Sequence, residues 1–278
     1  MEKKWWHKTV GYQIYPKSFQ DTNGDGIGDL KGVIRHLDKI EKLGANVIWL
    51  CPVFASPMVD NGYDISDYMD IDPSFGTMED MKELIAEAKK RGIRILMDLV
   101  VNHSSDRHAW FQAALKDPFG KYGKYYVFRE GKDGKEPNNW RSIFGGSAWE
   151  KVPGYDNLYY LHIFTKEQPD LNWENPKLRE EIYEMILKWM DLGLGGFRLD
   201  AISHLKKNYQ YTNLPPDGPD EYNMAFEYFN NVDGLADILC EMKERTFAPT
   251  DALTIGEYDH MGPCLLYTSD AADDLIGV

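Results

Sequence analysis

The sequence lacks the features that mark several large classes of protein. Its three cysteines, at positions 51, 240 and 264, are odd in number and far apart, without the short spacings of a metal site. No stretch approaches the roughly 18 consecutive apolar residues of a membrane-spanning helix. Residues 1–16 contain no apolar segment of a secretory signal. We therefore expect a reduced, cytoplasmic protein with no membrane span.

Basic charge is also in deficit. The chain of 278 residues carries 31 Lys and Arg against 45 Asp and Glu, a formal net charge of −14, which argues against nucleic acid or an anionic membrane as a partner. Hydrophobic residues make up 43% of the chain, enough for the substantial core of a soluble globular protein. Aromatic residues make up 13%, and their flat rings beside carboxylates suit sugar binding.

Apolar patterns in the first hundred residues alternate between strand and helix. Short apolar or alternating runs at 10–14, 46–50 and 93–101 predict strands, and helical periodicity at 30–44 and 77–92 predicts the helices between them. Strand and helix in this order predict a parallel sheet with right-handed crossovers. A doubly wound sheet would carry a glycine fingerprint after its first strand, but the glycines there are interleaved with acids that repel phosphate. A barrel is therefore expected.

Two positions are expected to begin these helices. Asp29 precedes the first as an N-cap, and Thr77 with Asp80 forms a capping box at the second.

The pattern breaks between residues 104 and 172. This stretch is rich in Gly, Pro, Trp and Tyr and shows no helix periodicity, and it is too long for a loop, so we interpret it as a small inserted domain. Regularity returns with a helix that Asn175 caps, a strand at 196–200, a helix from Asp233 and a strand at 252–257.

The acidic loop at 21–29 matches the first nine positions of an EF-hand calcium loop. It has oxygen side chains at positions one, three, five and nine and glycine at six, but Gly32 stands where the loop's bidentate Glu is expected, and no helix precedes it. The loop is therefore not an EF-hand. A turn that binds nothing is the alternative; we favour calcium, because converging oxygens repel one another without a cation. The expected ligands are Asp21, Asn23, Asp25, Asp29 and the Ile27 carbonyl oxygen.

A carboxylate follows an arginine at the end of the strand at 196–200. Residues at the carboxyl ends of parallel strands face the ligand side of an α/β fold, so Arg198 and Asp200 are candidates for a site. A buried ion pair that only holds loops together is the alternative. Glu257 stands in the same position at the end of the strand at 252–257.

Several ordered motifs together resemble the α-amylase superfamily of glycoside hydrolases, family 13, and within it the oligo-1,6-glucosidase and α-glucosidase group. The motifs are DTNGDGIGD at 21–29, DNGYD at 60–64, DLVVNH at 98–103, QPDLNW at 168–173, GFRLDAISH at 196–204 and TIGE at 254–257. The resemblance implies a (β/α)8 TIM barrel with a small domain inserted after strand three. It also implies intracellular exo-acting hydrolysis of short malto- or isomalto-oligosaccharides.

The resemblance assigns roles to particular residues. Asp200 would be the nucleophile and Glu257 the general acid/base of a retaining reaction, and the acidic loop would hold a structural calcium. Asp98 would orient Arg198 without contacting the substrate itself. The subsite for the terminal glucose would be lined by Asp60, Tyr63, His103 and Arg198.

Double displacement requires two carboxyl groups about 5–5.5 Å apart, one ionised and one protonated. We expect Arg198 to favour the ionised form of Asp200, and charge repulsion to raise the proton affinity of Glu257.

The chain departs from the family after the fifth strand. The family's third acidic residue, its histidine and an arginine that pairs with the equivalent of Asp60 are absent, so we expect a truncated barrel. Residues 264–278 resemble translated adapter sequence and are expected to be non-native. The expected divisions are 1–103 for strands one to three, 104–172 for the inserted domain and 173–263 for strands four and five. The isolated chain is expected to be unstable and inactive, because an unclosed barrel leaves strand edges open.

Other functions remain open at this level. Trehalose-6-phosphate hydrolase and sucrose isomerase share the family, and a non-catalytic relative of amino-acid transporter heavy chains or a carbohydrate-binding module would not need the paired carboxylates. Ala201, after the nucleophile, leans toward α-1,4 rather than α-1,6 linkage. We expect a small oligosaccharide as substrate, no organic cofactor and, in the full-length protein, a monomer.

Overall fold

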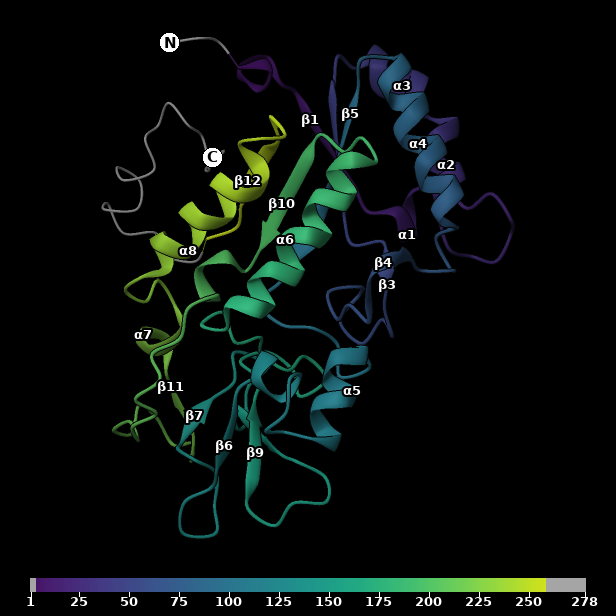
Figure 1. Ribbon diagram of the computed structural model, residues 1–278. Helices are drawn as coiled ribbons and strands as arrows, with labels where there is room; N and C mark the ends of the chain where they lie inside the picture. The colour runs from purple at the N-terminus through teal and green to yellow at the C-terminus, as the bar shows by residue number, and fades with distance from the viewer. Residues whose placement is uncertain (1–3, 259–278) are drawn as a thin grey trace.

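The computed structural model describes residues 4–258, so the proposed non-native tail at 264–278 lies outside the described residues. Its centre is a parallel sheet of five strands in the order β1-β2-β5-β10-β12 (Figure 1). The strands are β1 (Gly11–Ile14), β2 (Val47–Leu50), β5 (Arg94–Val100), β10 (Gly196–Asp200) and β12 (Leu253–Gly256). Their order in space is their order in the chain, as expected for the wall of a barrel.

Helices connect successive strands of this sheet. They are α2 (Leu30–Arg35), α3 (Leu37–Lys42), α4 (Met78–Lys90), α6 (Pro176–Asp191) and α8 (Leu235–Met242). Their apolar faces pack against the sheet: Leu84 of α4 and Trp189 of α6 are fully buried. Parallel strands joined by helices that cover one face of the sheet are the architecture predicted from the sequence.

Three of the four predicted helix starts are confirmed, and the start at Asp233 is wrong, because α8 begins at Leu235 with Gly234 at its N-cap position and no side-chain cap. The Asp29 side chain accepts a hydrogen bond from the backbone N–H of Gly32 at 2.7 Å. Thr77 and Asp80 form a reciprocal capping box, and the Asn175 side chain accepts from the N–H of Lys177 at 2.9 Å. Each cap satisfies donors that the first turn of a helix leaves unpaired.

The single helix predicted over 30–44 is wrong, because α2 and α3 are separated at His36. The backbone of His36 leaves helical geometry (φ −109°, ψ 5°), and its N–H bonds to the Val33 carbonyl three residues back. The His36 ring contacts Gln20 Oε1 through Nε2 at 3.1 Å and the Phe19 ring edge to face. Apolar periodicity continues across the break, so the sequence pattern alone does not reveal it.

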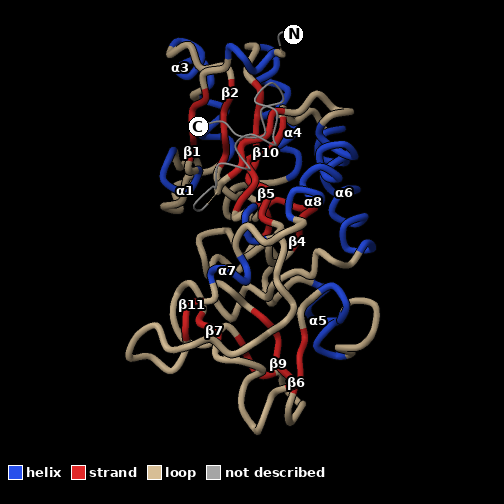
Figure 2. The backbone as a smooth tube through the Cα atoms, turned by 90° about the vertical axis from the view of Figure 1, so that its left-hand side faces the viewer, coloured by secondary structure: helices blue, strands red, loops and turns tan. Residues whose placement is uncertain are grey.

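The segment from 104 to 172 contains a separate antiparallel sheet in the order β6-β9-β8. Its strands are β6 (Phe128–Glu130), β8 (Trp149–Lys151) and β9 (Leu158–Leu161), and they lie below the parallel sheet in Figure 2. The expectation of no helix in this segment is wrong, because α5 (Ala109–Lys116) lies at its start. That helix has only eight residues and buries Phe111 and Ala114, too few positions to show a period.

Short elements complete the described chain. They are α1 (Pro16–Phe19), β3 (Phe54–Ala55), β4 (Asp67–Ile71), β7 (Trp140–Arg141), β11 (Asn223–Met224), α7 (Phe226–Phe229), the 3₁₀ turns Trp5–Lys8, Gly123–Tyr125 and Ile202–His204, and a π turn at Lys243–Phe247. β7 and β11 pair in parallel, which joins the inserted segment to the loop that follows β10.

Gly196, at the start of β10, is required by close packing. Its φ is +145°, and a Cβ placed there would lie 1.8 Å from the carbonyl oxygen of Leu253 on β12. The absence of a side chain therefore allows β10 and β12 to pair.

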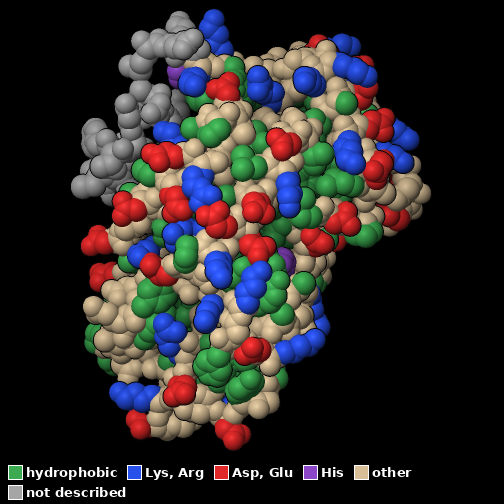
Figure 3. All heavy atoms as spheres, in the orientation of Figure 1, with side chains coloured by type: hydrophobic (Ala, Val, Ile, Leu, Met, Phe, Trp, Pro, Cys, Tyr) green, Lys and Arg blue, Asp and Glu red, His purple; other side chains and the backbone are tan. Residues whose placement is uncertain are grey.

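In the part of the chain that the structure describes, no helix combines the length and apolar character needed to cross a bilayer. On the face drawn in Figure 3, Lys and Arg side chains are interspersed with Asp and Glu.

Candidate active site

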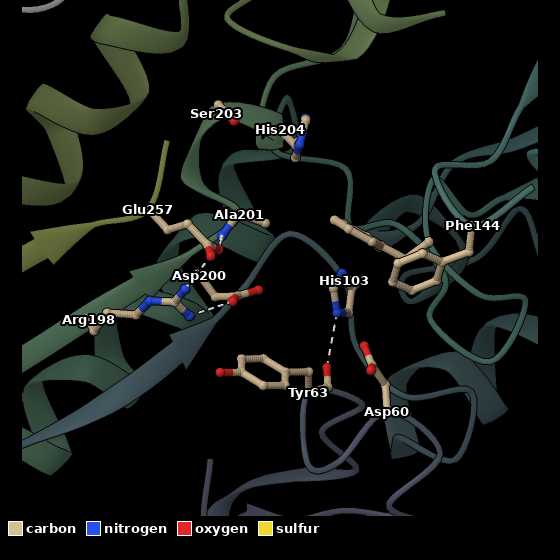
Figure 4. Close-up of a pocket in the computed structure, with 11 residues that line it drawn as sticks. Asp60, Tyr63, His103, Phe144, Arg198, Asp200, Ala201, Ser203, His204 and Glu257 are labelled. Carbon is tan, nitrogen blue, oxygen red and sulfur yellow. Dashed lines mark hydrogen bonds and ion pairs between the residues drawn. The ribbon is translucent and has the colours of Figure 1, made fainter. Parts of the chain in front are cut away.

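A cavity of about 360 Å³ opens at the carboxyl ends of β5, β10 and β12 (Figure 4). It contains all six residues that the sequence proposed for catalysis and substrate binding, together with five that were not proposed. The lining residues are Asp60, Tyr63, His103, Phe144, Phe164, Arg198, Asp200, Ala201, Ser203, His204 and Glu257. Residues nearly 200 positions apart in the sequence are therefore brought to one edge of the sheet.

The register of the parallel sheet explains the arrangement. Arg198 on β10 lies beside Asp98 on β5, and side chains on a strand alternate between its two faces. Phe197 and Leu199 therefore pack on one face while Arg198 and Asp200 share the other, toward the cavity. Glu257 directly follows β12, and its backbone N–H bonds to the Leu199 carbonyl at 2.9 Å.

One guanidinium holds three carboxylates. Nη1 of Arg198 donates to Asp98 Oδ1 at 2.8 Å and to Asp200 Oδ1 at 2.6 Å. Nη2 lies 2.5 Å from Glu257 Oε1. Trp49 donates from Nε1 to the other oxygen of Asp98 at 3.0 Å, and its ring lies beneath the guanidinium at 5.2 Å. Arg198 is thereby fixed from below by Asp98 and Trp49 and presents its remaining donors to Asp200 and Glu257.

Three carboxylates around one cation leave an excess of negative charge. Burial raises the pKa of Asp98 to about 6, although Arg198 and the Trp49 hydrogen bond oppose the increase. Burial lowers the pKa of Arg198, but the three carboxylates raise it by more. The pKa is therefore raised overall, and the guanidinium stays charged. The cluster is therefore expected to hold a proton on one of its carboxyl groups near neutral pH.

Arg198 favours the ionised form of Asp200, as expected, but burial outweighs its influence. Burial is the largest influence on Asp200 and raises its pKa well above the ordinary value; Arg198 opposes this, and the charges of Glu257 and Asp98 reinforce it. The Asp200 side chain is 11% exposed, against 49% for Glu257. Desolvation therefore disfavours the charged form of Asp200 more than that of Glu257. The negative charge of Glu257 also contributes to the raised pKa of Asp200.

Ala201 turns the chain immediately after Asp200. Its φ of +47° lies in the left-handed region, which is uncommon for a residue with a Cβ. In this conformation its backbone N–H donates to Glu257 Oε2 at 3.1 Å. A strained backbone position thus links the two catalytic candidates.

The opposite wall of the cavity is built on a buried carboxylate. Asp64 is fully buried and accepts from the backbone N–H groups of Val59 and Asp60, each at 3.0 Å, and from Ser56 Oγ. These bonds fix the turn that carries Asp60 and Tyr63 toward the cavity. Burial raises the pKa of the Tyr63 phenol, and the negative charge of Asp98 adds to the effect, so the phenol remains a hydrogen-bond donor.

His103 joins this wall to the sheet. Its Nε2 lies 3.0 Å from the carbonyl oxygen of Tyr63, and burial lowers its pKa, so the ring is neutral at pH 7. Gln168 donates from Nε2 to Asp60 Oδ2 at 3.0 Å. Gln168 was not proposed as a site residue, although it belongs to the QPDLNW motif that supported the resemblance.

Four further lining residues were missed. Ser203 and His204 belong to the GFRLDAISH motif, whose position in the sequence was a usable signal. Phe144 and Phe164 lie in the inserted segment, and no pattern there distinguished them from core aromatic residues. Phe164 packs edge to face against both His103 and His204.

The acidic loop at 21–29 is held by its own backbone. Asp21 accepts from the N–H groups of Asn23, Gly24 and Gly26, and the hydrogen bond from Gly24 is the largest cause of its lowered pKa. Asp29 accepts from Thr22 as well as capping α2. Among residues 4–258, no group of three His, Cys, Asp or Glu side chains is placed to hold a metal.

Calcium also binds amide and carbonyl oxygens. The loop supplies Asn23 and Ile27 as well as its aspartates, and hard oxygen donors of this kind fit Ca²⁺.

Comparison with known proteins gives a consistent result. A family model described as the catalytic domain of alpha-amylase matches residues 13–276. The chain is 49% identical over 280 aligned positions to an oligo-1,6-glucosidase of Parageobacillus thermoglucosidasius, an alignment that covers 99% of this chain and 49% of that protein. It is 54% identical over 260 positions to a glucan 1,6-alpha-glucosidase of Streptococcus pneumoniae, covering 92% and 44%.

Solved structures agree with the sequence comparison. A trehalose-6-phosphate hydrolase of Bacillus licheniformis superimposes with a TM-score of 0.91 at 43% identity, covering 98% of this chain and 48% of that one. The trehalulose synthase MutB superimposes at 0.85 and 48% identity, covering 92% and 45%. The chain therefore spans about half the length of these relatives. The match confirms the predicted fold class.

Proposed function

Because the chain belongs to the alpha-amylase catalytic-domain family, we propose that a protein carrying it is a retaining, exo-acting α-glucosidase. The substrates would be short malto- or isomalto-oligosaccharides, cleaved at the terminal α-linked glucose. One observation carries the proposal: Asp200 and Glu257 bind adjacent nitrogens of the same buried guanidinium inside the cavity. Sharing one guanidinium favours the short carboxyl separation, about 5–5.5 Å, of a retaining reaction.

The residues divide the reaction into two displacements. In the first, ionised Asp200 attacks the anomeric carbon while Glu257 gives its proton to the departing glycosidic oxygen, which leaves a covalent glucosyl ester on Asp200. In the second, Glu257 takes a proton from water, and the resulting hydroxide displaces Asp200. Two inversions retain the anomeric configuration, and the proton taken from water restores the acid form of Glu257.

Arg198 and the far wall of the cavity have separate roles. The Arg198 guanidinium stabilises the carboxylate of Asp200 before attack and after release of the ester. Asp60, Tyr63 and His103 would hold hydroxyl groups of the terminal glucose. Asp60 and Phe144 lie across the cavity from Glu257 (Figure 4), an arrangement that favours removal of one terminal unit.

The relatives named for other reactions differ in what their substrates require. A phosphorylated disaccharide needs an uncompensated cation, but among the described lining residues the sole Lys or Arg is Arg198, which three carboxylates already neutralise. An assay on trehalose-6-phosphate beside maltose and isomaltose distinguishes these substrates. Sucrose isomerisation uses the same pair of carboxylates, and the product distribution on sucrose would distinguish it.

We also propose calcium as a structural ion at the 21–29 loop. Asp21, Asn23, Asp25 and Asp29 would supply side-chain oxygens and Ile27 its carbonyl oxygen. The ion would neutralise the loop next to the start of α2. Calcium at 1 mM should raise the melting temperature of the protein in a scan that magnesium does not reproduce, and an Asp21→Asn/Asp25→Asn variant should lose that response. An equal response from the variant would exclude this loop as the site.

A reduced cytoplasm and a monomeric state complete the proposal. They rest on cysteines that are free in the described residues, Cys51 and Cys240, and on the interspersed surface charge. Size-exclusion chromatography with light scattering tests the oligomeric state.

The deciding experiment is an assay of a full-length protein that carries this chain on maltose, isomaltose, sucrose and trehalose-6-phosphate. We expect glucose release from the first two with the α-anomer formed first, as seen by proton NMR. Asp200→Asn and Glu257→Gln should each lower kcat by at least about 10⁴-fold. Preference for the phosphorylated sugar, or initial release of the β-anomer, would contradict the proposal.

A further inference from the structure

Lys207 is the feature of the molecule that the proposed chemistry does not explain. It follows β10 in the loop that leaves the cavity, and its side chain is completely buried. Its Nζ lies 2.9 Å from Asp170 Oδ1 and donates to Asn102 Oδ1 at 2.7 Å. Burying an ammonium is costly unless its partners are held in place, so a lysine here calls for an explanation.

The partners of Lys207 come from separate parts of the chain. Asn102 follows β5, and Asp170 closes the inserted segment and accepts the backbone N–H of Ile163 at 2.5 Å. Asn102 and Asp170 also bond directly, from Nδ2 to Oδ1 at 2.9 Å. The three polar groups form a closed triangle away from solvent, in which each bond restricts the other two.

The chemistry of lysine determines which way the Asn102 amide faces. An ammonium group can only donate, so the atom of Asn102 that it contacts must be the carbonyl oxygen. The amide nitrogen then faces Asp170 and, at 3.2 Å, Nδ1 of His103. Because that nitrogen donates, Nδ1 of His103 must accept and carries no proton.

The proton of the neutral His103 ring is therefore on Nε2, the nitrogen at the cavity. It is donated to the carbonyl oxygen of Tyr63 at 3.0 Å. Two groups lie 3.0 Å from this nitrogen: the Tyr63 carbonyl oxygen, which accepts, and Nε2 of Gln168, which is a donor because Gln168 Oε1 accepts from Thr165. The contacts at Nε2 alone therefore do not choose between the two tautomers. The Asn102 NH₂ group at Nδ1 decides the tautomer, since only an unprotonated Nδ1 can accept from it.

We propose that Lys207 is a positioning residue, which fixes the tautomer and orientation of His103 through Asn102 and Asp170 and so prepares the cavity wall for a glucose hydroxyl. The proposal deepens the proposed α-glucosidase function and rests on it for the identity of the ligand. Without Lys207 this wall would have two hydrogen-bonding states. If the Asn102 amide turns over, its oxygen faces Nδ1 of His103, and the proton of the imidazole moves to Nδ1 to match it.

Replacing Lys207 with methionine tests this, since methionine is similar in length but uncharged. The variant removes the donor-only group that faces the Asn102 carbonyl oxygen, so the Asn102 amide can turn over. Histidine labelled with nitrogen-15 reports the tautomer directly, with the His103 signals assigned from a His103→Gln spectrum. We expect Nε2–H alone in the full-length protein that carries the unchanged chain, called the parent protein below. In its Lys207→Met variant we expect a mixture of tautomers.

Kinetics on isomaltose and maltose provide the second measurement. His103 exchanges no proton with the reacting atoms, so a misoriented ring should weaken binding of substrate and transition state alike. We expect KM to rise about fivefold to tenfold in Lys207→Met, with kcat within about twofold. The matched control is Lys206→Met: Lys206 is adjacent, pairs with Glu174 and has no contact with Asn102 or Asp170 among those described. It should leave both parameters within about twofold.

The outcomes separate clearly. An unchanged tautomer together with an unchanged KM in Lys207→Met would overturn the proposal, and so would an equal effect in Lys206→Met. If Lys207→Met does not fold, Lys207→Met/Asp170→Asn removes the stranded charge and is judged by the same two readouts. If the parent protein hydrolyses no glucoside, the proposed function fails, but the tautomer measurement still decides the role of Lys207.

Discussion

Replacement of Asp98 by asparagine should separate the stability of the fold from the activity of the site. Asp98 is buried and accepts hydrogen bonds from Arg198 and Trp49. A pKa raised from 3.8 to about 6 in the folded state means that its negative charge costs about 3 kcal/mol at pH 7 and above, even with Arg198 beside it. Asparagine removes that cost but turns an N–H toward a donor, at about 1–3 kcal/mol.

The two effects nearly cancel. We expect the free energy of unfolding of Asp98→Asn, measured by urea denaturation at pH 7.5, to lie within about 2 kcal/mol of the parent protein. Activity should nevertheless fall about 100-fold or more, because Arg198 loses the group that aims it at Asp200. The buried charge would then be retained for function at the expense of stability.

The pH dependence has a definite sign. The folded state of the parent binds a proton on Asp98 more tightly than the unfolded state does, so its stability relative to Asp98→Asn should rise as the pH falls through about 6 toward 4. A loss of more than about 4 kcal/mol at pH 7.5, with no pH-dependent difference between the two proteins, would show that the pair stabilises the fold and would refute the reasoning.

Three further predictions concern other parts of the chain. Gly196→Ala should lower the free energy of unfolding by more than about 3 kcal/mol, because its Cβ would overlap the Leu253 carbonyl, whereas Gly218→Ala, with open space around it, should be near neutral in the same urea titration. His108 is buried with its pKa lowered to about 4, so its stabilising contribution is complete above about 6.5 and is lost as the pH falls; between pH 7 and 4.5 the parent should lose about 2–3 kcal/mol more than His108→Asn. Trp49→Phe keeps the ring beneath Arg198 but removes the hydrogen bond to Asp98, so kcat should fall about threefold to tenfold, while Trp5→Phe, which removes a hydrogen bond at an exposed site, should not change it.

Much of the fold could be predicted because its local signals agree with its tertiary structure. The parallel strands appear as short apolar runs, and Asp29, Thr77 and Asn175 begin their helices as expected. The break at His36 could not be predicted, since a contact with Gln20, which is distant in the sequence, accompanies it and the apolar spacing is unchanged. Helix α5 escaped notice because eight residues are too few for a period.

The positions of the site residues could be predicted from the sequence, but several of their properties could not. Asp200 and Glu257 could be located because both stand at strand ends, where a parallel sheet collects side chains. The raised pKa of Asp200 could not be predicted, since it depends on the burial of its side chain in the folded protein. Lys207 was equally invisible: beside Lys206 it looks like half of an exposed basic pair, and its complete burial is a property of the tertiary structure.

The pairing of β7 with β11 has a consequence for synthesis on the ribosome. β1, β2 and β5 lie within the first hundred residues and can associate as soon as they emerge, with only short loops to close. The partner of Trp140 on β7, Asn223, is translated 83 residues later, so the inserted segment must wait for it while β10 forms in between. At roughly 5–20 residues per second this interval lasts several seconds. The wall of the cavity that carries Phe144 is therefore expected to be among the last parts of the described chain to reach its final position.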